Sequence, residues 1–194
     1  MLPCADIVYE SSTRAVVTLR TPISPCLQNM LRHALLADIP CQAVQFVTFL
    51  TFESPITDEE VAMRLGQLAV TGAEPYAFRV RKTSAAGVPL TWVTDADIDD
   101  PAGRVVRPSS GRLYLAPLLE HATLDVVCHT GAGTGRQHTL WNNVYVERPT
   151  DASFVVETTG ALDAGAAWNA AIDASCAAMR RFCACSQLSR PTAA

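Results

Sequence analysis

Residues 25–70 constrain the fold of this 194-residue chain most, because they carry three secondary-structure signals in direct succession. Ser24 and Pro25 form the first signal, an N-cap residue followed by proline at the first helical position. Leucine and alanine recur on one face from there to Asp38, which predicts an amphipathic helix. The second signal is a run of β-branched and aromatic residues at 44–52, which predicts a strand buried on at least one side.

The third signal is a short helix that begins after Thr57. Glu60 lies three residues beyond Thr57 and completes a capping-box pattern, and the apolar stripe that follows ends at residues 66–70. Because side chains alternate along a strand, the preceding strand has two distinct faces. Val47 and Phe49 lie on one face. The other face receives Val44, Phe46, Thr48, Leu50 and Phe52.

The flanking segments predict sheet on both sides of this stretch. Residues 7–10 and 15–20 are short β-branched runs separated by a polar turn, which is typical of an antiparallel hairpin. Residues 72–149 contain short alternating runs between turns rich in Gly, Pro and Asp, so they predict a β-rich region. Residues 154–158 predict one more strand, and a helix of about twenty residues follows, longer than the usual 11 or 12.

These elements predict an α+β protein with an interruption. Residues 1–70 and 151–187 form one domain of sheet and helices, residues 71–150 form an inserted β-rich domain, and residues 188–194 form a disordered tail. The last helix carries a heptad seam with spacings of 4, 3, 4 and 3. This pattern leaves open whether the helix packs on its own sheet or against a second helix. The seam consists of Trp168, Ile172, Ser175, Met179 and Phe182.

Composition and charge exclude several classes of function. With 49% apolar residues, 18% charged residues and a net charge of −4, the chain is globular, and its fourteen arginines and single lysine are scattered. We therefore expect little direct contact with DNA. No run of about 18 apolar residues and no N-terminal secretion pattern occurs, so we expect a soluble intracellular protein that binds no membrane. Seven widely spaced cysteines favour a reducing compartment and predict reduced, mostly buried thiols.

No motif supports a metal, a cofactor or a catalytic residue. The chain has no Cys-x-x-Cys pair, and no helical pattern follows the glycine-rich segment 131–135, which favours a flexible β-turn over a phosphate loop. A Cys–His nucleophile remains an alternative, although no flanking motif supports it. It would pair Cys41 or Cys128 with His129 or His138. A small cysteine-dependent enzyme is therefore one alternative function. A stand-alone homodimeric binding module is another.

Four motifs follow one another in a fixed order. Residues 29–40 read Asn-Met-Leu-Arg-His-Ala-Leu-Leu-Ala-Asp-Ile-Pro, and residues 58–66 begin with Asp-Glu and end with Arg-Leu-Gly. Residues 135–141 read Gly-Arg-Gln-His-Thr-Leu-Trp, and residues 154–162 read Phe-Val-Val-Glu-Thr-Thr-Gly-Ala-Leu. Together they resemble the α-like subunits of multi-subunit DNA-directed RNA polymerases. That family includes the bacterial α subunit, its archaeal counterpart and the third-largest subunit of eukaryotic RNA polymerase II.

The resemblance implies a non-catalytic scaffold whose first domain serves dimerisation and assembly, in the nucleus or the cytoplasm. It implies three kinds of partner: a smaller α-like subunit, the second-largest catalytic subunit and small accessory subunits. In the family the first and last helices build the dimer contact, and the loop around His138 and Trp141 resembles the heterodimeric branch. The implied partner interface comprises Leu27, Leu31, Arg32, Leu35, Arg64, Trp168, Ile172, Met179 and Phe182, and the family loop comprises Gly135, His138 and Trp141.

The chain departs from the family pattern at several positions. His33 replaces a second arginine, Leu140 replaces a lysine, and Leu68 and Ala69 replace an Ile-Pro pair, so the contacts made there in relatives are in doubt. No cysteine lies within residues 71–103, so we expect neither the zinc loop nor the iron–sulfur domain of some relatives. We also expect no second C-terminal domain of the bacterial kind. These omissions favour the hypothesis of a reduced polymerase, such as that of a large DNA virus, located in a virion or virus factory.

Overall fold

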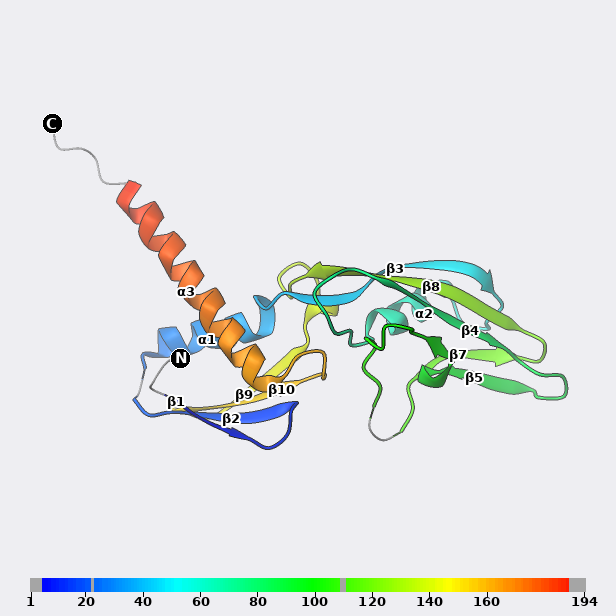
Figure 1. The fold of residues 1–194 in the computed structure, drawn as a ribbon, viewed down its shortest axis with the longest axis horizontal. Helices are drawn as coiled ribbons and strands as arrows, with labels where there is room; N and C mark the ends of the chain where they lie inside the picture. The colour runs from blue at the N-terminus through cyan, green and yellow to red at the C-terminus, as the bar shows by residue number, and fades with distance from the viewer. Residues whose placement is uncertain (1–4, 22, 109–110, 189–194) are drawn as a thin grey trace. The chain divides into compact units, whose positions relative to one another are not determined.

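The structure is a computed structural model that describes residues 5–21, 23–108 and 111–188 (Figure 1). Within these residues the chain forms three α-helices and ten strands in antiparallel sheets, which confirms the α+β class. None of the helices described is both long enough and apolar enough to cross a membrane. The predicted tail, residues 188–194, lies outside the described residues apart from Leu188, which ends the last helix.

The chain divides into two compact units. Unit 1 consists of the described residues up to Ile39, Thr134–Arg136 and the residues from Asn142 onward. Unit 2 consists of Pro40–Gly133 and Gln137–Trp141. Each unit has its own hydrophobic core. The boundaries differ from those expected from the sequence, because strand pairing between distant segments, rather than the order of elements along the chain, decides which segments share a core.

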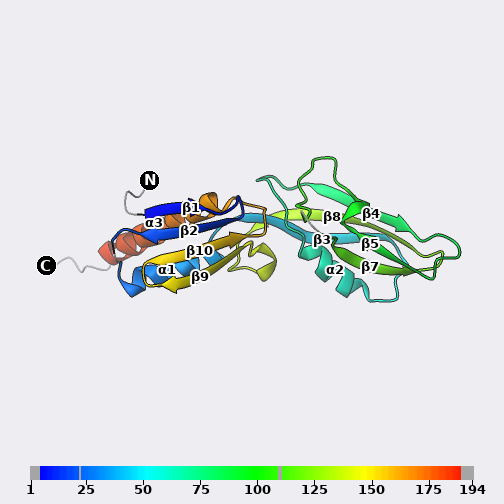
Figure 2. The ribbon, with the colours of Figure 1, turned by 90° about the horizontal axis from the view of Figure 1, so that it is seen from below.

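Unit 1 is a four-stranded antiparallel sheet with two helices on one face (Figures 1 and 2). Across the sheet the strands are β1 (Ala5–Tyr9), β2 (Arg14–Leu19), β10 (Ser153–Thr158) and β9 (Val144–Thr150). β1 and β2 form the predicted hairpin, and the helices are α1 (Pro25–Ala37) and α3 (Ala164–Leu188). The core lies between sheet and helices and includes Val17, Leu35, Phe154, Val156 and Trp168.

Helix α1 begins where the sequence predicts. The Ser24 hydroxyl accepts a hydrogen bond from the Leu27 N–H at 3.3 Å, which satisfies one donor of the first turn. Gln28 is buried, and its Nε2 donates to the carbonyl oxygens of Ile23 at 2.9 Å and Asp151 at 2.8 Å. These bonds tie the start of α1 to the turn between β9 and β10.

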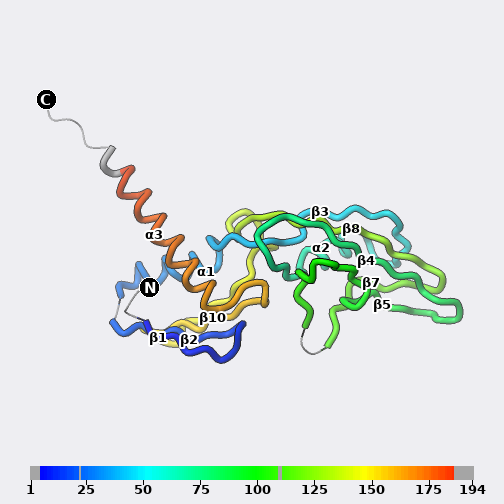
Figure 3. The backbone as a smooth tube through the Cα atoms, viewed as in Figure 1, coloured from blue at the N-terminus to red at the C-terminus, as the bar shows by residue number. Residues whose placement is uncertain are grey.

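Unit 2 contains a four-stranded sheet, a two-stranded sheet and one helix, traced as a tube in Figure 3. The larger sheet has the order β3 (Cys41–Phe52), β8 (Thr123–Gly133), β4 (Ala77–Thr83) and β6 (Ile98–Asp99). The smaller sheet pairs β5 (Leu90–Thr94) with β7 (Tyr114–Leu119), and the helix is α2 (Asp58–Gly66). The core of unit 2 includes Val61, Leu65, Val80, Leu118 and Val126.

The predicted N-cap hydrogen bond of α2 forms, but the Glu60 side chain, the other half of the predicted capping box, bonds to Arg64. Thr57 Oγ1 accepts a hydrogen bond from the Glu60 N–H at 3.3 Å. The Glu60 carboxylate accepts from Arg64 Nη2 at 2.6 Å, one turn further along the helix. The acidic first turn of α2 and Arg64 in its last turn both complement the helix dipole.

The predicted alternation of β3 holds from Phe46 to Leu50, but Val44 does not share the face of Phe46 as predicted. Val44 is 3% exposed, whereas Phe46 is 65% and Leu50 is 55% exposed. The register against β8 shifts between Val44 and Phe46 and again between Phe49 and Thr51. An inserted residue of this kind moves the following side chains to the opposite face of the strand, because the side-chain period is two.

We expect the Asp125 carboxylate to make unit 2 sensitive to acid. Arg79 donates to it from Nε at 2.6 Å, and this pairing holds the pKa of Asp125 below its usual range. A carboxyl group with a lowered folded-state pKa stabilises the fold above its unfolded pKa of about 4, and that stabilisation is lost as the pH falls through the folded value. Thermal unfolding monitored by circular dichroism should therefore show a steeper acid decline for the natural chain than for Asp125→Asn.

The matched control is Asp151→Asn, because the Asp151 side chain is 93% exposed and, among the described residues, forms an ion pair only with Arg148. This change should leave the acid profile almost unaltered. Superimposable profiles for the natural chain and Asp125→Asn would contradict the assigned role of the Arg79 pair.

Candidate protein–protein interface

The predicted seam of α3 divides into a buried part and an exposed part. Trp168 is 2% and Ser175 is 4% exposed, so the first part packs into the core of unit 1, with Ile172 half-buried beside them. Met179 is 46% and Phe182 is 74% exposed. Figure 1 shows α3 continuing past α1 and the sheet of its own unit. Packing on its own sheet therefore accounts for only the first part of the seam.

Of the predicted residues of α1, Leu31 and Leu35 lie in or against the core of unit 1. Leu35 is 1% exposed, Leu31 packs against the same cluster, and Leu27 is half-buried. Arg32 is half-buried, and its guanidinium donates to Asn29 Oδ1 from Nε at 3.2 Å and from Nη2 at 3.1 Å. The structure thus holds Arg32 against its own helix, next to the exposed His33.

Arg64, the other predicted arginine, belongs to unit 2. In addition to its ion pair with Glu60, its Nη1 lies 3.5 Å from the carbonyl oxygen of Leu115 on β7. About 30% of the surface of the Arg64 side chain is accessible to solvent. It therefore bridges α2 and β7 and also presents part of its surface to solvent.

The start of the family loop packs against the C-terminal end of α1 within unit 1. A Cβ at Gly135 would lie 2.6 Å from the Leu36 carbonyl oxygen and 3.1 Å from Ala37 Cα, so only glycine allows this approach. The next residue, Arg136, donates its backbone N–H to the Ala37 carbonyl at 3.1 Å and its Nη2 to Asp38 Oδ2 at 3.0 Å. The sequence analysis did not predict this ion pair. The feature that could have indicated it is the acidic residue Asp38 at the C-terminal end of the helix.

The end of the family loop folds into unit 2 around Trp141. The indole is 8% exposed, and its Nε1 donates to the Gly131 carbonyl at 2.9 Å. A Cβ at Gly133 would lie 2.4 Å from the indole ring. The glycine-rich segment was predicted to be a flexible turn, but Gly131 and Gly133 belong to β8, and two glycines at strand spacing were the missed signal. His138 is exposed, and its Nδ1 accepts from the Leu140 N–H at 3.2 Å.

In the described segments, the cysteines and histidines do not assemble a reactive site. Burial raises the pKa of the Cys128 thiol to about 12, and the adjacent His129 points to the opposite face of β8. The Cys41 thiol donates to the Trp141 carbonyl at 2.7 Å. In the part of the chain that is described, no group of three potential ligands is placed to hold a metal ion. The prediction of mostly buried thiols is wrong, because four are exposed: Cys26, Cys176, Cys183 and Cys185.

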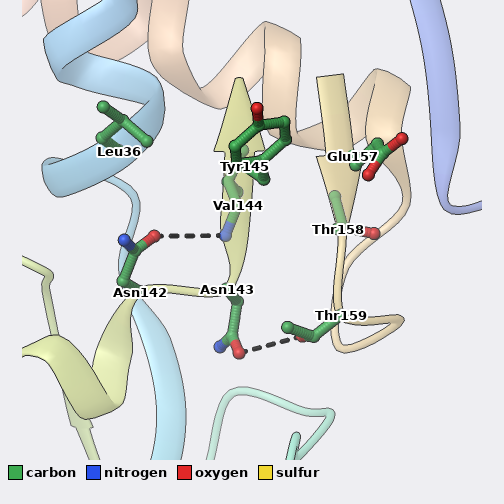
Figure 4. Close-up of a pocket in the computed structure, with 8 residues that line it drawn as sticks. All are labelled: Leu36, Asn142, Asn143, Val144, Tyr145, Glu157, Thr158 and Thr159. Carbon is green, nitrogen blue, oxygen red and sulfur yellow. Dashed lines mark hydrogen bonds between the residues drawn. The ribbon is translucent and has the colours of Figure 1, made fainter. Parts of the chain in front are cut away.

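A pocket of about 360 Å³ lies in unit 1 between the end of α1 and strands β9 and β10 (Figure 4). Asn142 accepts a hydrogen bond from a backbone N–H of β9 at 3.3 Å, and Thr159 Oγ1 donates to Asn143 Oδ1 at 2.9 Å. The carboxylate of Glu157, which also lines the pocket, forms an ion pair with Arg14. The Thr159–Asn143 bond links the ends of β9 and β10, and the Glu157–Arg14 pair joins β10 to β2, so we interpret these contacts as structural.

A second groove, of about 280 Å³, runs beside the exposed part of α3. Three alanines of α3 leave the space open, and residues 134–136 with the end of α1 line it further. The Arg136–Asp38 pair lies at this lining, and Arg181 contributes a second guanidinium. The remaining lining residues are Thr134, Ala174, Ala177 and Ala178.

Comparison with protein-family models gives no match. Comparison with curated proteins gives relatives named DNA-directed RNA polymerase subunit Rpo3. The Halobacterium salinarum protein is 28% identical over 119 residues, covering 60% of this chain and 47% of the relative. The Methanocaldococcus jannaschii protein is 27% identical over 158 residues, covering 77% and 78%. The Aeropyrum pernix protein is 26% identical over 138 residues, covering 59% and 47%.

The chain thus spans about half the length of the Halobacterium and Aeropyrum relatives that it matches. These similarities confirm the resemblance to the α-like RNA polymerase subunits that the four motifs indicate.

We expect Gly135→Ala to destabilise unit 1. The added methyl group would meet backbone atoms of α1, which cannot rotate away as a side chain could, so residues 134–136 must shift and the Arg136–Asp38 pair is strained. The free energy of unfolding should fall by about 1–3 kcal/mol, as measured by urea unfolding. Gly66→Ala is the matched control, because its Cβ would meet only the Val44 carbonyl oxygen at 3.9 Å. Equal stability of the two variants would contradict the close approach.

Proposed function

We propose that this chain, a relative of the archaeal RNA polymerase subunit, is a non-catalytic assembly subunit of a DNA-dependent RNA polymerase. Unit 1 acts as a dimerisation domain that is discontinuous in the sequence. It pairs with a smaller α-like subunit, and the pair carries the large catalytic subunits, the second-largest among them, together with small accessory subunits. The resemblance and the named relatives support the polymerase assignment.

The observation that carries the pairing is the continuation of the α3 stripe beyond the core. Trp168 and Ser175 are buried in unit 1, and the same seam continues with Met179 and Phe182 in solvent. Covering apolar surface is favourable by about 25 cal/mol per Å², before the ordering costs of association. A large aromatic residue that is 74% exposed on a regular helix is typical of an interface anchor. The exposed part of α3 therefore fits a partner helix.

The chemistry of the chain supports a scaffold over the cysteine-dependent enzyme. A thiol with a pKa of about 12 is protonated near neutral pH, so Cys128 is a poor nucleophile. The His138 ring accepts a hydrogen bond within its own loop. An assembly subunit needs neither group to react.

Local charge pairing supports little direct contact with DNA. Arg14 pairs with Glu10 and Glu157, and Arg79 pairs with Asp125, so much of the positive charge is neutralised within the fold. The chain as a whole carries a net charge of −4. Phosphate binding requires clustered, accessible cations, so partner subunits are the better candidates for holding nucleic acid.

We expect Phe182→Asp to abolish co-purification with the smaller α-like subunit when both chains are expressed together. The substitution places a carboxylate in the proposed contact, whereas the helix itself should still form because Phe182 is not part of the unit 1 core. Ala184→Asp is the matched control, since position 184 lies on the far side of the same exposed helical turns.

Size-exclusion chromatography with mass measurement provides the comparison, and circular dichroism checks that each variant keeps its helix content. An intact complex with Phe182→Asp would refute pairing through this part of α3. A stable homodimer of the isolated natural chain would instead favour the homodimeric binding module.

A further inference from the structure

We propose that the open edge of strand β9 in unit 1 binds an extended segment of another polypeptide, which adds to the sheet as a further strand and carries a basic residue opposite Glu147. This contact involves none of the exposed residues of α3, so the inference does not depend on the pairing proposed above. It follows from the direction of the backbone groups of β9, the pocket at the start of this strand and the charge along it.

The backbone of β9 leaves one edge of the sheet open. β9 is the last strand of its sheet and pairs only with β10 among the described strands (Figure 2). The Thr159 N–H donates to the Asn143 carbonyl at 3.1 Å, and these two residues continue the β9–β10 register. Because backbone groups alternate in direction along a strand, Tyr145 and Glu147 also direct their N–H and C=O groups toward β10. Val146, which lies between them, directs its groups outward.

The outward groups of β9 are only partly satisfied within the chain. Asn142 Oδ1 accepts from the Val144 N–H at 3.3 Å, as the carbonyl oxygen of a neighbouring strand would. The Val144 carbonyl and both backbone groups of Val146 form no hydrogen bond with any described residue. The register against β10 shifts beyond Glu147, which limits regular pairing to the first part of β9. An extended segment supplies the alternating donors and acceptors that this edge requires.

The pocket of about 360 Å³ lies at the start of this edge (Figure 4). Since Val144 belongs to the core of unit 1, Tyr145 lies on the face of the sheet away from the helices, opposite Glu157 in the register. Both residues line the pocket, and Tyr145 is 59% exposed. Asn143 also lines it and is 9% exposed, yet its Nδ2 donates to no described atom. The pocket therefore retains a donor for a carbonyl oxygen of the added segment.

Glu147 determines the charge that the added segment needs. It is exposed, lies on the same face of β9 as Tyr145 and forms no ion pair among the described residues. The adjacent Arg148 pairs with Asp151 at 2.9 Å, so the uncompensated charge of this edge is negative. Opposite charges on neighbouring strands stabilise a pair of strands, and like charges destabilise it. The segment therefore carries Lys or Arg opposite Glu147 and an apolar side chain, two positions away, beside Tyr145.

A synthetic peptide tests this inference with the full chain, because main-chain hydrogen bonds supply the affinity in strand addition. The probe is a threonine-rich octapeptide with a leucine and, two positions away, a lysine; a second peptide has glutamate in place of the lysine. Amide hydrogen exchange of the isotopically labelled chain, measured by NMR, is the readout. We expect the lysine peptide to slow exchange of the Val146 N–H. The Tyr145 and Glu147 N–H groups, already bonded to β10, should change little.

Charge reversal tests the predicted basic residue. Glu147→Arg should bind the lysine peptide about threefold more weakly than the natural chain does, and should prefer the glutamate peptide. Glu74→Arg, at an exposed position of unit 2, is the control and should bind as the natural chain does. Unchanged Val146 exchange at the highest soluble peptide concentration would overturn the inference, as would an unchanged peptide preference in Glu147→Arg.

A homodimer of the natural chain that already protects the Val146 N–H would assign this edge to a second copy and would also overturn the inference. These outcomes leave the proposed function standing, because co-purification of Phe182→Asp tests that function separately.

Discussion

The pairing of β10 with β2 is the interaction on which the rest of the structure depends. Phe154 lies opposite Val17 in this register, and both side chains are fully buried. Because β10 comes from the far end of the chain, the pair joins two distant segments into one sheet. That sheet gives α1 and α3 a common surface. Everything between residues 40 and 133 can then form a separate unit with its own core.

Small side chains decide how closely α3 approaches its sheet and α1. Ala164, Ala167 and Ala171 are all fully buried, which leaves Trp168 to fill the space against Phe154 at 5.3 Å between ring centroids. Close approach of backbones at small residues improves packing without new polar bonds. Alanines also recur further along α3. There no sheet covers them, and their small side chains leave the groove beside Arg181 open. Alanine therefore allows close packing in the first part of α3 and leaves an open surface in the later part.

Local signals were predictable from the sequence, and long-range ones were not. The Ser24 and Thr57 caps and the spacing of the α3 seam depend on residues within one or two turns, so they could be identified directly. The change of face between Val44 and Phe46 depends on a register shift against β8, which no pattern within β3 encodes. The exposure of Phe182 likewise depends on where the sheet ends. The motifs were sufficient to identify the relatives, whereas the ion pair between Arg136 and Asp38 could be recognised only in the folded structure.

The sequence separation within unit 1 also sets an order in time. A ribosome releases the chain from its N-terminus, so the single long segment of unit 2 is complete before β10 exists to pair with β2. Until then α1 has no finished sheet to cover, and contacts that span long loops form slowly. Helix α3 is synthesised after the other described helices and strands. The surface that carries Phe182 is therefore presented only after the sheet of unit 1 and the whole of unit 2 have been synthesised.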